Sequence, residues 1–276
     1  ERKLNLMLDN ARRSLPSLYD FNLPKEGEIK FCNSIKEAVE NVSWIQESVP
    51  ERLNMKQDVF KEIQKYCDKS IVIASSTSGF KPSELNEGAT NPSQILVCHP
   101  FNPVYLLPLV EVVGGKKTSK IFINKAAKVY ESIGMKPLIV RKEIEGYISD
   151  RLQEALWRES LHLIKDGIAT TDEIDDAIVY GPGLRWAFMG VCLTFHLAGG
   201  ETGMKHMLEQ FGPALKLPWT KLKAPPLDKK LKNLMISGTQ KQSKKFSIYE
   251  LEKQRDVFLI GIMKTLNKHQ KNKFPN

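Results

Sequence analysis

The sequence places a histidine where it could exchange a proton with a bound substrate. His99 directly follows the apolar run 95–97, and Glu111 lies twelve residues further along, inside a second apolar run at 109–113. Histidine titrates near neutral pH, and a buried carboxylate can fix its tautomer and stabilise the imidazolium that forms when the ring accepts a proton. The pair by itself fits a core histidine beside an unrelated acid better, so the neighbouring polar residues must decide.

Two further polar side chains favour the catalytic interpretation. Ser78 belongs to the polar segment 75–79, which follows the apolar run 70–74, and Asn102 follows His99 by three residues. Each also has a purely structural explanation, a strand-end turn for Ser78 and an Asx turn before Pro103 for Asn102. Because polar groups occur at compatible positions around His99, we interpret these residues as a candidate catalytic site.

The composition is that of an ordinary soluble protein. The chain has 276 residues, of which 41% are hydrophobic and 26% charged, which is enough for one large or two medium domains. It has no apolar run of about 18 residues, so we expect no membrane span. Its four cysteines show no metal-ligand spacing. We therefore expect no metal site and a cytoplasmic protein with reduced thiols.

The positive charge does not indicate a nucleic-acid partner. The net charge of +9 is concentrated in the lysine-rich part of the chain from residue 216 onward. These lysines lack interleaved aromatic residues and any RNA-binding signature. They therefore predict a solvated helical face.

The first half of the chain alternates short apolar strands with helices. We expect a helix before Pro16, and further helices at residues 35–41, 53–67 and 119–133. Strands are expected at residues 29–32, 42–49, 70–74, 95–97, 109–113 and 136–140. This alternation predicts a parallel sheet with helices on both faces.

The second half shows helical periodicity without strands. A long helix is expected up to Gly167, a second from Thr170, and further helices at residues 200–210 and 249–267. The lysine-rich stretch 221–247 is expected to be a loop or a mobile segment. The predicted domains are therefore residues 1–142 and an all-α domain of residues 143–276.

One feature of a dinucleotide-binding fold is absent from the start of the chain. Such a fold opens with a strand, a Gly-x-Gly-x-x-Gly turn and a helix, but Gly27 is the only glycine in residues 1–60. We therefore expect the sheet to correspond to the later part of a Rossmann-like domain that lacks its first βαβ unit.

Taken together, the motifs resemble the L-3-hydroxyacyl-CoA dehydrogenase superfamily, and most closely its carnitine-oxidising branch. The resemblance extends from residues 46–51 through 75–79 and 99–115 to three segments of the helical half. Those segments are 155–159, 185–190 and 211–219. The resemblance implies a truncated Rossmann-like domain followed by an all-α domain that forms a homodimer.

The resemblance also assigns roles to individual residues. The base that removes the substrate's hydroxyl proton corresponds to His99, and the carboxylate that orients it to Glu111. Contacts to the substrate oxygen and to the cofactor correspond to Ser78 and Asn102. The cofactor residues further include Glu51, near the nicotinamide ribose, which could equally be an exposed acid at a helix start. Lys56 matches a lysine near phosphate groups, although a lone lysine on a helix is more often solvated.

One position departs from the acyl-CoA members of the family. They carry an asparagine where this chain has Asp150. An acid near the substrate would disfavour a CoA thioester and favour a cationic alcohol, although Asp150 could also cap a helix or pair with Arg151. Aromatic faces suit a trimethylammonium group, and Trp186 and Phe188 are the candidates among the aromatics of the helical half. Core or dimer packing is the alternative for both.

We therefore expect an NAD-dependent L-3-hydroxy acid dehydrogenase that oxidises L-carnitine to 3-dehydrocarnitine. One alternative is another substrate of the superfamily, either L-gulonate or a 3-hydroxyacyl-CoA. A second alternative is a non-catalytic protein, either a crystallin-like structural relative or an inactive fragment. The expected partner is a small-molecule substrate, without nucleic acid or membrane.

Overall fold

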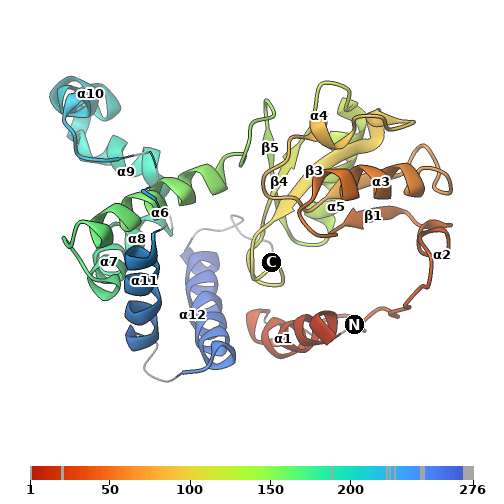
Figure 1. Ribbon diagram of the computed structural model, residues 1–276, viewed down its shortest axis with the longest axis horizontal. Coiled ribbons are helices and arrows are strands. Elements are labelled where there is room, and N and C mark those ends of the chain that lie inside the picture. The colour runs from red at the N-terminus through yellow and green to blue at the C-terminus, as the bar shows by residue number, and fades with distance from the viewer. Residues whose placement is uncertain are drawn as a thin grey trace. The chain divides into compact units, whose positions relative to one another are not determined.

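The computed structural model describes residues 2–19, 22–187, 189–221, 223, 225–226, 228–242 and 246–269. These residues form two compact units (Figure 1). The first contains the chain up to Arg151 and the part of the last helix from Leu259 onward, and the second contains residues 152–258. The predicted boundary between residues 142 and 143 lies about nine residues before this division, which falls between Arg151 and Leu152. The return of the last helix to the first unit was not predicted.

Five short strands form the sheet of the first unit, and their spatial order is their order in the chain. They are β1 (Trp44–Glu47), β2 (Val72–Ser75), β3 (Ile95–Pro100), β4 (Leu109–Val113) and β5 (Lys136–Val140). All neighbouring strands are parallel except β3 and β4, which are antiparallel. The prediction of a parallel sheet is therefore wrong for this pair. The eight residues between the two strands are too few for a crossover, so the chain has to reverse its direction.

A strand predicted at residues 29–32 is also wrong. These residues belong to no element, and the side chains of Ile29 and Phe31 are exposed. An apolar run of this length forms a strand only if a neighbouring strand satisfies its backbone groups. The other five predicted strands are confirmed. The strand predicted at 42–49 is shorter, the one at 70–74 is shifted by one to two residues, and the one at 95–97 extends to residue 100, whereas 109–113 and 136–140 keep their predicted bounds.

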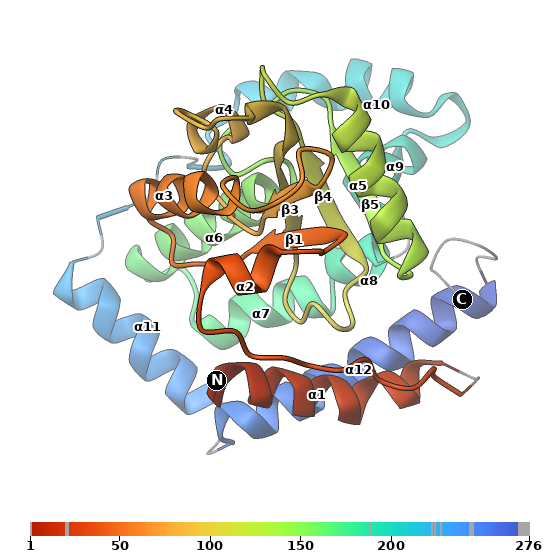
Figure 2. The ribbon, with the colours of Figure 1, turned by 90° about the vertical axis from the view of Figure 1, so that its right-hand side faces the viewer.

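Helices cover both faces of the sheet (Figure 2). On one face, α3 (Leu53–Ile63) and α4 (Pro82–Leu85) contribute Phe60 and Leu85 to a buried cluster with alternate strand residues. On the other face, α5 (Lys120–Ser132) packs Tyr130 against the remaining strand residues. The central strands are therefore buried on both sides, which explains their unbroken apolar runs.

The first unit also contains helices outside the sheet layers. They are α1 (Arg2–Leu18) and the first-unit part of α12 (Ile248–His269), together with the 3₁₀-helix η1 (Pro92–Gln94). The short helix α2 (Ile35–Val39) instead contributes Val39 to the buried cluster on the α3 side of the sheet. The predicted cap of α2 is confirmed, because the Ser34 hydroxyl accepts a hydrogen bond from the Glu37 N–H at 3.2 Å. Pro16 lies inside α1 and does not end it. Leu18, Leu106 and Met263 form a small cluster between α1 and α12.

The described part of the second unit is helical, as predicted. Its elements after α6 (Ser149–Lys165) are α7 (Thr171–Val179), α8 (Pro182–Trp186), α9 (Gly190–Ala198), η2 (Gly200–Thr202), α10 (Met204–Phe211), η3 (Gly212–Lys216) and α11 (Lys229–Gln242). The start of α7 is confirmed by a capping box between Thr170 and Glu173. The predicted loop at 221–247 is wrong over α11. Leu231 packs there against Leu161 and Ile164, and this burial outweighs the polar composition.

A buried carboxylate joins the sheet to the start of α6. Glu111 lies on β4 and is fully buried. Its Oε1 accepts hydrogen bonds from the backbone N–H groups of Ile148 and Ser149, both at 3.0 Å, and its Oε2 lies 3.2 Å from His99 Nδ1. Burial raises the pKa of Glu111, but the hydrogen bonds from His99, Ser149 and Ile148 outweigh it, so the pKa lies below its ordinary value. The favourable charge at a helix N-terminus adds to this effect.

We predict that Glu111→Gln destabilises the protein in a pH-dependent manner. Because the pKa of Glu111 is lower in the folded than in the unfolded chain, its charge stabilises the fold above the unfolded pKa. That contribution is lost as the pH falls through the folded pKa. The variant should be less stable near neutral pH by about 1–3 kcal/mol in urea unfolding.

The stability difference between wild type and Glu111→Gln should shrink as the pH is lowered from about 7 to about 4. The matched control is Glu131→Gln, an exposed acid on α5, which should change the stability little at either pH. A difference for Glu111→Gln that stays constant over this range would contradict the assigned role of its charge.

Candidate active site

The predicted histidine–glutamate pair is formed across two neighbouring strands. His99 on β3 is directly opposite Glu111 on β4 in the antiparallel register. The chain from His99 to Glu111 therefore leaves β3, reverses its direction and reaches the paired position on β4. Glu111 is fully buried and His99 nearly so, so water does not compete strongly for their contact.

The hydrogen bonds assign a different function to each nitrogen of the His99 ring. Because the carboxylate of Glu111 can only accept, Nδ1 carries the proton and donates it to Oε2 at 3.2 Å. The lone pair then lies on Nε2, where the hydroxyl of Ser78 is 3.1 Å away and donates. The lowered pKa of Glu111 keeps its charge, which stabilises the ring once Nε2 accepts a proton. This geometry is the one that a general base and its orienting acid would require.

Two aromatic rings enclose the histidine. The ring of Phe101 lies 4.6 Å from that of His99, and the ring of Tyr147 lies 5.7 Å away. The buried Tyr147 hydroxyl donates to the carbonyl oxygens of Phe80 at 2.6 Å and Thr77 at 3.3 Å. Burial raises the pKa of this hydroxyl, so it remains a neutral donor. Tyr147 thus fixes the loop that carries Ser78.

Sequence reasoning missed Tyr147. The available signal was a large aromatic residue directly after Gly146 and just before a helix start. Both residues have a positive φ, +69° for Gly146 and +47° for Tyr147. A bulky residue rarely adopts this conformation unless its surroundings impose it. Here the burial and hydrogen bonds of the Tyr147 side chain impose it.

Asp150 lies in the first turn of α6, close to the reactive nitrogen. Its Oδ2 is 3.8 Å from His99 Nε2, and a quarter of its side chain is exposed. It is therefore on the same side of the ring as Ser78, opposite to Glu111. Arg151, which could have paired with Asp150, donates to the carbonyl of Glu145 at 3.3 Å. The carboxylate of Asp150 is therefore close enough to interact electrostatically with His99.

The other residues predicted for the site are less closely connected to His99. Asn102 is exposed in the loop that leaves β3, and its side chain has no hydrogen bond to the described residues. It follows His99 closely and leaves its amide available to a ligand. Trp186 lies in α8 of the second unit, and Phe188 lies outside the described residues.

Glu51 and Lys56 lie where the parallel strands β1 and β2 end. Nearly half of the Glu51 side chain is exposed, whereas Lys56 is almost fully buried, with its Nζ 3.0 Å from Glu47 and 3.3 Å from Glu51. Ligands of doubly wound sheets bind at the carboxyl ends of the strands. The exposed carboxylate of Glu51 fits a nucleotide hydroxyl there. Lys56 does not fit a phosphate contact, because it is buried.

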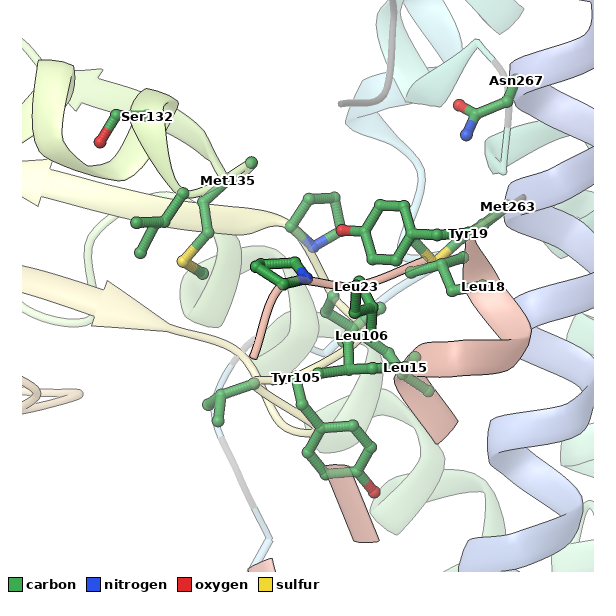
Figure 3. Close-up of a pocket in the computed structure, with 16 residues that line it drawn as sticks. Leu15, Leu18, Tyr19, Leu23, Tyr105, Leu106, Ser132, Met135, Met263 and Asn267 are labelled. Carbon is green, nitrogen blue, oxygen red and sulfur yellow. The ribbon is translucent and has the colours of Figure 1, made fainter. Parts of the chain in front are cut away.

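A separate pocket of about 500 Å³ is lined by none of these residues. It lies in the first unit, and Leu15 and Leu18 of α1, Leu106 of the loop after β3 and Met263 of α12 contribute to its wall (Figure 3). The lining is mainly apolar and contains no carboxylate, histidine, lysine or cysteine. We therefore place the candidate chemistry at His99.

Within the described ranges, no group of three or more histidine, cysteine, aspartate or glutamate side chains could hold a metal ion. No helix in the same part of the chain is long and apolar enough to cross a membrane.

Comparison with known proteins identifies the family. Residues 24–144 match the NAD binding domain of 3-hydroxyacyl-CoA dehydrogenase, and residues 146–247 match its C-terminal domain. The L-carnitine dehydrogenase of Bacillus cereus is 57% identical over 269 residues, which are 98% of this chain and 82% of that enzyme. The L-carnitine dehydrogenase of Oceanobacillus iheyensis is 54% identical over 256 residues, which are 93% of this chain and 83% of that enzyme.

A solved structure agrees at the level of the fold. The NAD⁺-dependent dismutase 5-formyl-3-hydroxy-2-methylpyridine 4-carboxylic acid 5-dehydrogenase is similar with a TM-score of 0.78. The match covers 96% of this chain and 87% of that one, at 23% identity. The resemblance inferred from the sequence motifs is thus confirmed, and the chain belongs to the 3-hydroxyacyl-CoA dehydrogenase family.

Proposed function

We propose that this protein oxidises the 3-hydroxyl group of L-carnitine to give 3-dehydrocarnitine, with NAD as the cofactor. The observation that carries the proposal is the buried Glu111–His99 pair, whose reactive nitrogen faces both Ser78 and the acid Asp150. The sequence similarity to bacterial L-carnitine dehydrogenases supports it.

The residues of the site can carry out the proton transfer that alcohol oxidation requires. NAD, when bound, accepts the hydride from the carbon that bears the hydroxyl group. His99 Nε2 takes the hydroxyl proton, and Glu111 stabilises the imidazolium that results. The hydroxyl of Ser78, 3.1 Å from Nε2, can instead donate to the substrate oxygen once a substrate displaces its present contact. Asn102 supplies a second donor for that oxygen.

For the cofactor we assign a contact to Glu51, whose exposed carboxylate can accept a hydrogen bond from a ribose hydroxyl. Ser78 and Asn102 lie at the ends of neighbouring strands and would complete this side of the cofactor site. We do not assign a direct contact to Lys56, because its ammonium group is buried.

Asp150 supports a cationic substrate. In carnitine, the carbon that carries the trimethylammonium group is bonded to the carbon that carries the hydroxyl. A carboxylate 3.8 Å from the nitrogen that takes the hydroxyl proton is therefore close enough to attract that cation. A trimethylammonium group cannot donate hydrogen bonds, so we propose that Trp186 or Phe188 adds an aromatic face.

The alternatives fit the site less well. The phosphates of an acyl-CoA and the carboxylate of L-gulonate are anionic, and neither molecule carries a cation for Asp150. Burying a carboxylate is costly even when a partner compensates its charge. A crystallin-like structural protein would have no use for the buried carboxylate of Glu111. The intact base therefore favours an enzyme over both non-catalytic alternatives.

The first test of the function concerns the base. We expect His99→Gln to lower kcat for carnitine oxidation by about a hundredfold to ten-thousandfold, because general-base catalysis is lost. The dissociation constant for NADH should change little. Steady-state rates and fluorescence titration of the full-length protein measure the two quantities. A variant that keeps more than about a tenth of the wild-type kcat would remove His99 from the mechanism.

The second test concerns Asp150. We expect Asp150→Asn to raise KM for L-carnitine about tenfold and to change KM for NAD less than about twofold, because only the substrate carries the cation. Wild type should prefer carnitine to an uncharged analogue with a tert-butyl group, and the variant should lose this preference. If the variant instead lowers kcat and shifts its pH profile without raising KM, Asp150 tunes His99 and does not bind the cation.

We also propose that the protein is a cytoplasmic homodimer joined through its second unit. That unit exposes many large apolar side chains for its size, which is typical of a surface that a partner covers. They include Tyr180, Leu184, Leu197, Leu208, Leu215 and Trp219. The four cysteines are all free thiols, in keeping with a reducing compartment.

The dimer is tested by a charge placed on this surface. Leu215 is 85% exposed, and we expect Leu215→Glu to weaken self-association at least about tenfold in sedimentation velocity experiments. Ile121 on α5 of the first unit is 74% exposed, and Ile121→Glu is the matched control that should leave the dimer intact. A wild-type protein that sediments as a monomer at micromolar concentration would contradict the proposal.

A further inference from the structure

A buried ion pair lies beneath the proposed cofactor contact. Glu47 is the last residue of β1 and Lys56 lies on α3, and only 1% of either side chain is exposed. Lys56 Nζ lies 3.0 Å from Glu47 Oε1. Two opposite charges held this far from solvent lose much hydration energy, so each needs a full set of hydrogen bonds.

Acceptors that belong to the protein itself surround the ammonium group of Lys56. Besides Glu47, it contacts the carbonyl oxygen of Val49 at 3.1 Å and Oε2 of Glu51 at 3.3 Å. An ammonium group has three N–H bonds, and three acceptors surround it here. A phosphate contact would require Lys56 to give up one of these partners and to reach the surface.

The Glu47 carboxylate is likewise held by donors of the protein itself. Its Oε1 also accepts the backbone N–H of Val49 at 2.6 Å, and its Oε2 accepts the hydroxyl of Ser75 at 2.5 Å. Ser75 Oγ in turn accepts the N–H of Thr77 at 3.3 Å. Glu47 therefore connects the loop after β1 to the loop after β2.

Glu51 is the member of this network that reaches the surface. One of its carboxylate oxygens accepts the hydroxyl of Thr77, and the other faces Lys56. Nearly half of the side chain is exposed. The orientation of this exposed carboxylate is thus set from two sides by residues that are themselves buried.

We propose that Glu47 and Lys56 are positioning residues for the cofactor. The Glu47 carboxylate fixes the Lys56 ammonium group, and Lys56 together with Thr77 holds Glu51 in the orientation that accepts a nucleotide hydroxyl. Lys56 acts only through Glu51 and makes no cofactor contact of its own. This inference rests on the cofactor role of Glu51 proposed above.

The experiment is a double-mutant cycle on NADH affinity in the full-length protein, read by fluorescence titration. Lys56→Met should weaken NADH binding about tenfold, or about 1.4 kcal/mol, in the wild-type background. It should have almost no effect in the Glu51→Gln background. Equal losses in both backgrounds would show that Lys56 contacts the cofactor directly and would overturn the inference. If Glu51→Gln alone left the affinity unchanged, the proposed role of Glu51 would fail instead.

A second arm separates positioning from general stability. Lys56→Met leaves Glu47 as an unpaired buried charge and should lower Tm without cofactor, whereas the double variant Glu47→Gln/Lys56→Met removes both charges and should recover most of that loss. NADH affinity should stay low in the double variant, because Glu51 remains unsupported. Recovery of affinity together with Tm would show a merely structural role and contradict the proposal.

The matched control for both arms is Lys65→Met. Lys65 forms an ion pair with Glu62 just beyond the end of α3, but its side chain is 60% exposed. We expect this variant to leave both NADH affinity and Tm close to wild type. If Lys56→Met folds too poorly for titration, Ser75→Ala removes only one bond to Glu47 and should still weaken NADH binding. An unchanged affinity in Ser75→Ala would then count against the network.

Discussion

The structure of the site depends on the buried charge of Glu111. A carboxylate removed from water has to be compensated by hydrogen bonds, and here His99 and the first backbone N–H groups of α6 provide them. The same bonds fix the tautomer of the histidine and the point at which the helix begins. One electrostatic requirement therefore couples the tautomer of His99 to the position at which α6 begins.

The reversal of the chain between β3 and β4 makes this coupling possible. A parallel crossover would return β4 from the opposite end of the sheet, with a helix between the two strands. The antiparallel turn instead brings Glu111 directly beside His99. Because β1, β2 and β3 remain parallel, their carboxyl ends meet at the same edge. The base thus lies beside the strand ends at which a dinucleotide fold binds its ligand.

The segment 75–80 connects two charged clusters within the first unit. Ser75 bonds to Glu47 of the buried ion pair, and Ser78 bonds to the histidine. Between them, the carbonyl oxygen of Thr77 accepts the hydroxyl of Tyr147. A short loop is thereby held by the buried ion pair, by His99 and by Tyr147 just before α6. Such support limits the motion of the Ser78 hydroxyl relative to the base.

The sequence by itself determined the α/β and helical halves and most strands, because hydrophobic periodicity is a local signal. The pairing of His99 with Glu111 was predicted from neighbouring polar residues and the family resemblance, because the two residues alone fit a structural explanation better. The sequence wrongly predicted a strand at 29–32, because an apolar run forms a strand only beside a neighbouring strand. It also missed α11, which packing against α6 stabilises. The sequence also did not predict the burial of Lys56, because a lysine on a helix is usually solvated. Here the fold places Glu47 beside it in the interior. Only the tertiary structure decides such cases, because the energy of a charge depends on the groups that replace its water.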